Sequence, residues 1–392
     1  MSNKDRRLRI IWNSNGVNVP SGYGVFQRDL LYRLLKDGWI VAQSAFVGVE
    51  GAVTMLDGLP VYPKMQDPFG SDAILAHTRH FKADVTFSMQ DVWTLQGEAL
   101  NQLPHFIPYT PIDQEPVPQG VLDKVRYAYK IITFSKFGHE ALEKAGFTST
   151  LIVEGIDTNI FKPMDKAECR KFFGLPQDKF IFGQVGANKE NPGRKGWQEA
   201  LEAFKLFHDK HPDSIYFYQT NQPSPSGFPI EMYAQQLGLS NCIFKLDPYL
   251  GIWHTGSNEV AKMLNAFDVT LHPSSTEGFG LLSVESQACG TPPIVNNCTS
   301  MPELVIDGVS GEICDVGRRW FSPAGGFWYF ADVNSLYDKM EKLYRADRKK
   351  YGEAGRKNVV DNYNIDTLFT EKWVPYLEDL QTELLGVAPV AQ

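Results

Sequence analysis

The chain has 392 residues, of which 43% are hydrophobic and 21% charged, and its formal net charge is −8. This composition is typical of a globular protein rather than a disordered one, and the length predicts two domains. The negative charge disfavours recruitment of nucleic acid by the overall field, although a local basic cleft is compatible with it.

The sequence contains no apolar run of about 18 residues that could span a bilayer. Its N-terminus lacks the apolar segment of a secretory signal. Its five cysteines are scattered, without a C-x-x-C pair. We therefore expect a cytoplasmic protein without stable membrane insertion.

Short apolar runs alternate with helical patterns along the first half of the chain, which predicts βαβ units and a parallel sheet. The expected elements, in chain order, are a strand at 8–12, a helix at 23–36, a strand at 40–46, a helix at 72–81, strands at 85–87 and 106–109, a helix at 120–128, a strand at 130–134 and a helix at 136–145.

The second half repeats this rhythm, so we expect two Rossmann-like, doubly wound α/β domains over residues 1–158 and 159–364. A helical segment at 365–385 can pack on either domain, and residues 386–392 are expected to form a flexible tail. The other expected elements are a strand at 180–186, a helix at 197–210, a strand at 215–219, a helix at 230–237, a strand at 242–246, a helix at 258–266, a strand at 269–272, a helix at 281–288, a strand at 293–296 and a helix at 333–345.

The segment at 272–293 carries the clearest chemical signal, because it predicts a strand, a glycine-containing loop and a helix. Gly278 and Gly280 permit close approach of the backbone to a ligand. The unpaired N–H groups and positive dipole end of the helix suit phosphate oxygens. Glu285, about one turn into the helix, can accept hydrogen bonds from ribose hydroxyls, and Glu277 can reach a bound sugar. The alternative is a strand–loop–helix with surface glutamates.

This segment resembles the Glu-x7-Glu signature of the retaining family 4 (group 1) glycosyltransferases. The resemblance implies the GT-B fold, in which two Rossmann-like domains face each other across a cleft. It also implies that Glu285 holds the nucleotide ribose, that Glu277 contacts the donor sugar, and that backbone amides bind the diphosphate. The donor-binding residues implied here are Glu277, Gly278, Phe279, Gly280, Leu281, Leu282 and Glu285.

Arg194 and Lys195 match the two cations that the family places after the first strand of its second domain, where they neutralise the donor diphosphate. Arginine offers a bidentate fork to phosphate, and lysine a point charge. In the commonest family pattern the arginine directly follows the glycine of the strand, whereas Ala187 and Asn188 occupy that place here. Without the resemblance, an Arg-Lys pair is typical of a solvated surface.

The N-terminal domain is expected to supply the acceptor side of the site. Gly22, Tyr23 and Gly24 resemble the family's glycine-rich turn, whose backbone approaches the donor phosphates, although a lone Gly-x-Gly is not specific. Asp113 lies in a loop where family members commonly carry a histidine. Asp113 could orient or deprotonate an acceptor hydroxyl, and Asp91 is a candidate of the same kind. A turn-forming aspartate is the equal alternative.

Two further groups of residues have simpler interpretations. His77 and His80 lack an evident third ligand, so we assign them to a helix surface and predict no metal site. The resemblance also implies that no cofactor is required beyond the nucleotide-sugar co-substrate. The aromatic segment at 318–330 could stack bases, bind a glycan or make an oligomer contact, and packing in the core or between subunits is the simplest reading.

The predicted function is transfer of a sugar from a UDP- or GDP-sugar to a hydroxyl acceptor, with retention implied by the resemblance. The acceptor stays open among a glycan, a lipid-linked glycan, a small molecule, a protein and a modified nucleic-acid base. A GT-B epimerase or phosphorylase and a non-catalytic nucleotide-binding scaffold are alternatives. An NAD-dependent oxidoreductase is disfavoured, because no complete G-x-G-x-x-G follows a predicted strand.

Overall fold

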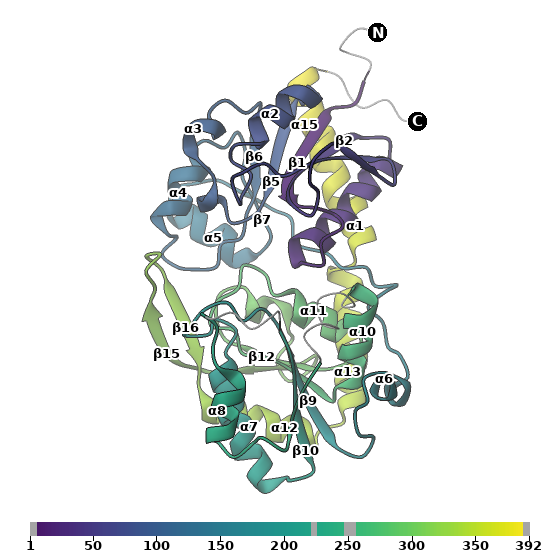
Figure 1. Ribbon diagram of the computed structural model, residues 1–392, viewed down its shortest axis with the longest axis vertical. Helices are drawn as coiled ribbons and strands as arrows, with labels where there is room; N and C mark the ends of the chain where they lie inside the picture. The colour runs from purple at the N-terminus through teal and green to yellow at the C-terminus, as the bar shows by residue number, and fades with distance from the viewer. Residues whose placement is uncertain (1–5, 221–225, 247–255, 387–392) are drawn as a thin grey trace. The chain divides into compact units, whose positions relative to one another are not determined.

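The computed structural model describes residues 6–220, 226–246 and 256–386 (Figure 1). The chain divides into two compact units, one made of residues 1–157 with 364–392 and the other of residues 158–363. Of the expected tail, everything after Gly386 lies outside the described residues. None of the helices in the described ranges combines the length and hydropathy that a bilayer span requires.

The first unit is a doubly wound α/β structure around one sheet with the strand order β3-β4-β2-β1-β5-β6-β7-β8. All neighbouring strands are parallel except the antiparallel pair β3–β4. Its elements are β1 (Arg9–Asn15), α1 (Gly22–Lys36), β2 (Ile40–Val47), β3 (Thr54–Leu56), β4 (Leu59–Tyr62), α2 (Ile74–Phe81), β5 (Val85–Met89), η1 (Val92–Thr94), α3 (Gly97–Leu100), β6 (Phe106–Tyr109), α4 (Gln119–Val125), β7 (Ile132–Thr133), α5 (Lys136–Lys144), β8 (Thr150–Leu151), α14 (Ile365–Leu368), η3 (Phe369–Trp373) and α15 (Val374–Leu385).

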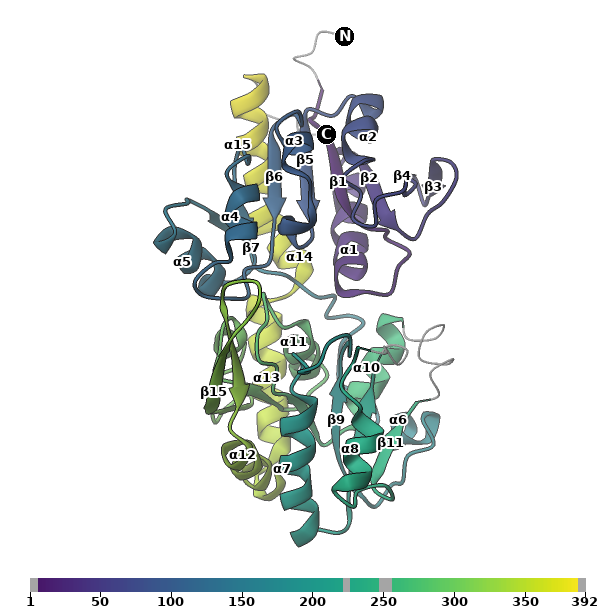
Figure 2. The same cartoon turned by 60° about the vertical axis from the view of Figure 1, so that its left-hand side comes forward.

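The last helices belong to this first unit, where they run along its strands (in yellow in Figures 1 and 2). The indole of Trp373 is fully buried, with ring-centroid distances of 5.6 Å to Trp12 and 5.2 Å to Tyr109. At the other end of the segment, the backbone N–H of Leu8 donates to Gln381 Oε1 at 3.1 Å. The C-terminal segment therefore completes the core of the N-terminal sheet.

The second unit has a parallel sheet with the order β11-β10-β9-β12-β13-β14 and a separate antiparallel hairpin, β15–β16. Its elements are α6 (Lys166–Phe172), β9 (Phe180–Val185), α7 (Trp197–Lys210), β10 (Ser214–Gln219), α8 (Ile230–Gln236), β11 (Ile243–Lys245), α10 (Ser257–Ala266), β12 (Val269–His272), α11 (Leu281–Ala288), β13 (Pro293–Asn296), η2 (Met301–Leu304), β14 (Glu312–Cys314), β15 (Val316–Phe321), β16 (Phe327–Ala331), α12 (Val333–Arg345) and α13 (Arg348–Asn362).

The core of the second unit lies between the central strands and α7. Trp197, Phe204 and Phe207 on α7 are fully buried and pack in one cluster with Phe182 of β9. Period-3.6 spacing of these large apolar residues gives α7 one continuous buried face. The two sheets confirm the expected α/β class with Rossmann-like units, and the expected elements differ from the observed ones by at most three residues at either end.

Two expectations about packing need correction. His77 does not lie on a helix surface; it is buried, and its Nδ1 lies 2.9 Å from Ser44 Oγ. The segment at 318–330 forms the hairpin β15–β16, and core packing holds for Phe330 but not for Phe321, which is 58% exposed. A two-stranded ribbon presents side chains on two faces, so a run of aromatic residues cannot bury all of its rings against one layer.

Candidate active site

The loop between β12 and α11 turns sharply at Gly280. This residue has φ +117, in the region that glycine tolerates, and a Cβ there would lie 3.0 Å from Leu304 Cδ1 and Met301 Sδ. Gly280 is the N-cap of α11 and brings no side chain to cap the first N–H groups of the helix. The N–H of Ser283 donates to Gly280 O at 3.0 Å. The N–H groups of Leu281 and Leu282 have no acceptor one turn earlier in the helix, which suits them to an anionic ligand.

Glu277 precedes this turn and is surrounded by three basic side chains. The Glu277 side chain is 10% exposed. Lys195 Nζ donates to its Oε1, Arg194 Nη1 lies 3.3 Å from its Oε2, and His272 Nε2 lies 3.2 Å from Oε1. The structure therefore brings Arg194, Lys195 and Glu277 together, although 82 residues separate Lys195 from Glu277 in the sequence.

Hydrogen bonds between the loop after β9 and the loop after β12 bring Arg194 and Lys195 close to Glu277. Arg194 O accepts hydrogen bonds from the backbone N–H of Ser275 at 2.8 Å and from its hydroxyl at 3.1 Å. Arg194 Nη1 also donates to Thr276 O at 3.0 Å. Gly196 has φ +71, and a Cβ at this position would collide with Pro273 O. Only glycine thus allows the loop after β9 to approach the loop after the neighbouring strand β12 so closely.

Burial and charge act against each other in this cluster. Burial would raise the pKa of Glu277, but Lys195 and Arg194 outweigh it and hold this pKa well below its usual range. Burial lowers the pKa of Lys195, and Glu277 offsets part of that effect. Burial also lowers the pKa of His272. Two carboxylates balance the two cations, because Glu190 Oε1 also lies 3.7 Å from Arg194 Nε. An anion at the N-terminus of α11 would be favoured by the helix dipole and would compete with these carboxylates for Arg194 and Lys195.

The other residues of the expected donor loop lie in the same strand–loop–helix unit. Phe279 is buried, with its ring centroid 5.9 Å from that of Tyr363. Leu281 and Leu282 form the first turn of α11, and Glu285 lies half-buried in the next turn. The acidic residues Glu277 and Glu285 thus flank the helix N-terminus in the chain.

The glycine-rich turn of the first unit has a local structural role. Gly22, Tyr23 and Gly24 open α1, directly after the loop that follows β1. The N–H of Gly24 donates to the N-cap Ser21 Oγ at 3.2 Å, and a Cβ on Gly24 would collide with Val19 O. Packing against the preceding loop therefore explains why position 24 needs glycine, without reference to a ligand.

Asp91 and Asp113 follow β5 and β6, which are neighbouring parallel strands. Both aspartates are half-buried, and Thr110 Oγ1 donates to Gln90 O at 3.2 Å, which ties the two loops together. Carboxyl ends of parallel strands meet at one edge of the sheet, where α/β proteins bind ligands. The two aspartates share that edge in the first unit, whereas Glu277 belongs to the second unit.

Four residues near Glu277 were not predicted from the sequence as site residues: His272, Ser283, Thr299 and Ser300. His272 could have been found, because it is a polar residue at the carboxyl end of a strand in a parallel sheet. The other three carry hydroxyl groups in contexts that are common in turns and first helical turns, so their sequence gives no such signal.

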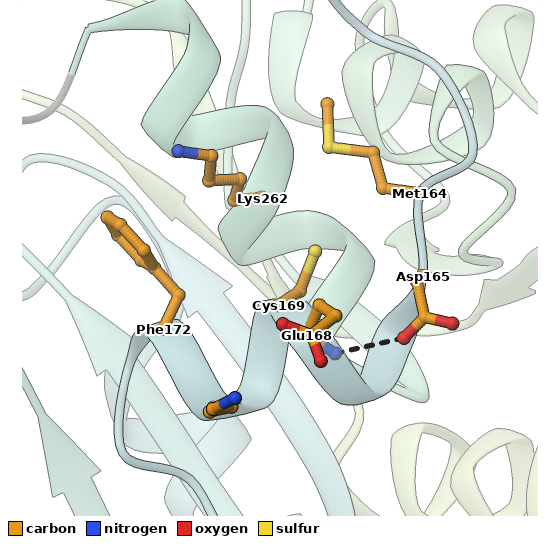
Figure 3. Close-up of a pocket in the computed structure, with 7 residues that line it drawn as sticks. Met164, Asp165, Glu168, Cys169, Phe172 and Lys262 are labelled. Carbon is orange, nitrogen blue, oxygen red and sulfur yellow. Dashed lines mark hydrogen bonds between the residues drawn. The ribbon is translucent and has the colours of Figure 1, made fainter.

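No group of three or more His, Cys, Asp or Glu side chains in the described ranges is arranged to hold a metal ion. A surface hollow of about 520 Å³ lies elsewhere in the second unit (Figure 3). It lies between α6 and α10, where Lys262 Nζ is 4.3 Å from the ring centroid of Phe172. None of the residues that line it belongs to the expected donor or acceptor set.

Comparisons with known proteins bear on this site. Residues 165–357 match the family model Glycosyl transferases group 1. The D-inositol 3-phosphate glycosyltransferase of Mycolicibacterium smegmatis is 31% identical over 165 residues, which are 41% of this chain and 35% of that protein. Its counterpart from Stackebrandtia nassauensis is 28% identical over 166 residues, 41% of this chain and 36% of that protein. The chain thus spans little more than a third of the length of these relatives.

Solved structures resemble the whole chain. Sucrose-phosphate synthase from Thermosynechococcus elongatus has a TM-score of 0.77 at 18% identity and covers 95% of this chain and 99% of its own. Anabaena HepE in complex with UDP and glucose has a TM-score of 0.72 at 18% identity and covers 94% and 99%. The expected GT-B fold class is confirmed. The part of the chain that matches the group 1 glycosyltransferases is residues 165–357.

Proposed function

We propose that this protein is an enzyme that transfers a sugar from a nucleoside-diphosphate sugar to a hydroxyl acceptor, with retention of the anomeric configuration. The observation that carries the proposal is the arrangement of Arg194 and Lys195 around Glu277 beside the N-terminus of α11. These are the groups that a departing nucleoside diphosphate needs, placed next to a carboxylate that can hold sugar hydroxyls.

In the proposed reaction, the bond between the anomeric carbon and the diphosphate oxygen breaks, and negative charge develops on the diphosphate. Arg194, Lys195 and the first N–H groups of α11 stabilise that charge, since they are held in place before the reaction. The phosphate oxygens compete with Glu277 for the two cations. The Glu277 carboxylate then accepts hydrogen bonds from the sugar, and Glu285 accepts them from the ribose.

The first unit is assigned to the acceptor. Gly22, Tyr23 and Gly24 approach the donor. Asp113, with Asp91 on the loop after the neighbouring strand, orients the acceptor hydroxyl and accepts its proton. The hydroxyl attacks from the face that the diphosphate leaves. The two cations supply the charge neutralisation that a metal ion provides in other phosphate sites, so we expect transfer without added metal in the cytoplasm.

UDP-sugars are the first donors to test and GDP-sugars the second. HepE, which shares the fold, has been crystallised with UDP and with UDP-glucose, which supports this order. The acceptor class is a separate question, since the inositol phosphate acceptor in the names of the relatives belongs to proteins that this chain matches over part of their length.

The test is thermal unfolding with UDP, GDP, ADP, CMP, their sugar conjugates and NAD, in the wild type and in Glu285→Ala. We expect one nucleoside diphosphate to raise Tm selectively, and this rise to shrink in the variant. Release of that diphosphate from its sugar conjugate, with an acceptor present, then measures transfer. Stabilisation by NAD alone would overturn the proposal. Nucleotide binding without turnover under any acceptor would indicate a scaffold, and a product formed without acceptor would indicate an epimerase.

A further inference from the structure

Thr299 has a backbone conformation that threonine rarely adopts. Its φ is +47, and among the described non-glycine residues with positive φ (Asp57, Lys82, His105 and Thr299) it alone is β-branched. A β-branched residue in this region is strained, because the branched Cβ crowds the backbone. Such strain persists only where the surroundings enforce it, and it concentrates at functional sites.

The surroundings of Thr299 do fix its conformation. Residues 298–301 form a turn closed by the hydrogen bond from Met301 N–H to Cys298 O at 3.1 Å, with Thr299 as its second residue. A positive φ at that position favours glycine. The turn is attached to the loop after β12 through Ser274. Asn296 Nδ2 donates to Ser274 O at 3.1 Å, and Cys298 Sγ lies 3.4 Å from the same oxygen. Glycine would satisfy the backbone here at lower cost, so the threonine side chain must contribute something glycine lacks.

What the side chain contributes is a hydrogen bond to the candidate active site. The backbone N–H of Glu277 donates to Thr299 Oγ1 at 3.1 Å. The adjacent Ser300 is fully buried, and its hydroxyl lies 2.8 Å from Glu277 O and 2.6 Å from Phe279 O. Thr299 and Ser300, here called the hydroxyl clamp, therefore hold the main chain on both sides of the Glu277 residue.

We propose that Thr299 is a positioning residue for the transfer reaction: its hydroxyl fixes the main chain of Glu277 while the donor phosphates compete for Arg194 and Lys195. This inference rests on the proposed function. Before donor binding, the cations themselves hold the Glu277 carboxylate. Once they turn to the phosphates, that restraint weakens, and the hydroxyl clamp keeps the carboxylate where the sugar hydroxyls lie. The strain at Thr299 is the cost of placing a hydroxyl at this point of the turn.

Two substitutions separate this role from a structural one. Thr299→Gly keeps the turn, removes the strain and deletes the hydroxyl. We expect its Tm to equal or exceed that of the wild type, its kcat to fall at least tenfold and its KM for the donor to change less than threefold. Thr299→Ser keeps the hydroxyl and should retain kcat within about twofold. A merely structural residue would not show higher stability with lower turnover.

Lys82→Gly is the matched control. Lys82 is exposed, has φ +55 and belongs to the first unit, outside every candidate site group. Its replacement should raise Tm and leave kcat unchanged, which shows that relief of backbone strain does not itself reduce activity.

Thr299→Gly with undiminished kcat would overturn the inference, as would an equal loss of kcat in Thr299→Ser. A fall in Tm together with kcat in the glycine variant would assign the residue to folding and would also overturn it. Failure of the proposed function looks different: the wild type itself would then neither bind a nucleoside diphosphate nor release one from a sugar conjugate.

Discussion

The Nε2 atom of His272 lies 3.2 Å from Oε1 of Glu277. Because Glu277 is ionised, it can only accept, so Nε2 carries the hydrogen of a neutral imidazole. The other ring nitrogen, Nδ1, then accepts from the hydroxyl of Ser283, 2.7 Å away. The ionised Glu277 thus sets the tautomer of His272, and His272 in turn helps to orient the Glu277 carboxylate. The site carboxylate is held from the side chain by His272 and from the main chain by the hydroxyl clamp.

Replacing Glu277 by glutamine tests the charge balance of the cluster. Lys195 would lose its carboxylate partner, whereas Arg194 would keep Glu190 at 3.7 Å. Removing one partner of a buried ion pair destabilises a protein by about 3–5 kcal/mol. We expect a lower Tm without ligand and a larger rise in Tm on adding UDP than the wild type shows, since the diphosphate replaces the missing charge. Turnover should fall roughly 100-fold, the scale of losing one preorganised polar group at a reacting centre.

Calorimetric unfolding with and without UDP, together with diphosphate release, measures both effects. Glu353→Gln serves as the control, because Glu353 is exposed on α13 and its nearest cation, Lys349, is 3.9 Å away at the surface. An unchanged Tm and unchanged turnover in Glu277→Gln would refute the assignment of this cluster as the donor site.

The sequence predicts the separate strand, loop and helix segments of this site, but not the contacts between them. The ends of β12 and α11 agree with the expected ones at 269–272 and 281–288, because the apolar run, the glycines and the helical pattern are all local signals. The contact of Arg194 with Glu277 depends on the neighbouring positions of β9 and β12 in the sheet, which periodicity cannot supply. The GT-B resemblance pointed to these residues, but it gave neither the direct ion pair nor the role of His272.

The structure differs from the sequence-based expectation at the β15–β16 hairpin and at His77, and nothing in the sequence indicated the conformation of Thr299. The aromatic run at 318–330 predicts packing in the core or between subunits, whereas the structure pairs these residues across an antiparallel hairpin, Trp320 with Trp328 and Phe321 with Phe327. The absence of an evident third ligand for His77 and His80 led to a predicted helix surface, whereas the tertiary fold buries His77 against Ser44 and Tyr62. The ring centroid of Tyr62 is 4.9 Å from that of His77. The conformation of Thr299 is likewise a property of the turn in its tertiary setting.

Burial of His77 predicts a specific pH dependence of stability. Burial lowers the pKa of His77 to about 4, with Asp72 opposing and His80 assisting that shift. The unfolded chain takes up this proton near pH 6.5, so between about pH 6.5 and pH 4 the unfolded state binds more protons than the folded state. Stability from this group is fully present above pH 6.5 and declines on acidification, by at most about 1.4 kcal/mol per pH unit.

His77→Gln should therefore flatten the loss of unfolding free energy between pH 7 and pH 5, measured by urea titration at each pH. Glutamine can keep a hydrogen bond to Ser44 without titrating. His80→Gln is the control on the same helix, and it should keep most of the slope, since His80 is exposed and makes the smallest of the three contributions to the pKa of His77. If the slope of His77→Gln equals that of the wild type, the buried histidine is not the source of the acid sensitivity.

Because Trp373 is buried against Trp12 and Tyr109, we expect the C-terminal segment to be needed for the stability of the N-terminal sheet. The indole fills the space between Trp12 and Tyr109, with both ring pairs close to edge-on. Removing a fully buried aromatic side chain leaves a cavity, and such changes cost about 3–5 kcal/mol. We expect Trp373→Ala to lower the free energy of unfolding of the first unit by that amount.

Trp93→Ala provides the comparison, because Trp93 belongs to the same unit and is 56% exposed. Its loss should change the unfolding free energy by roughly 0.5 kcal/mol or less. Hydrogen exchange during urea unfolding can show whether the strands β1, β5 and β6 are the part that is destabilised. These strands belong to the same unit as α14, η3 and α15. Equal stabilities of the two variants would show that these last helices are attached to the sheet without supporting it, and that the N-terminal sheet folds on its own residues.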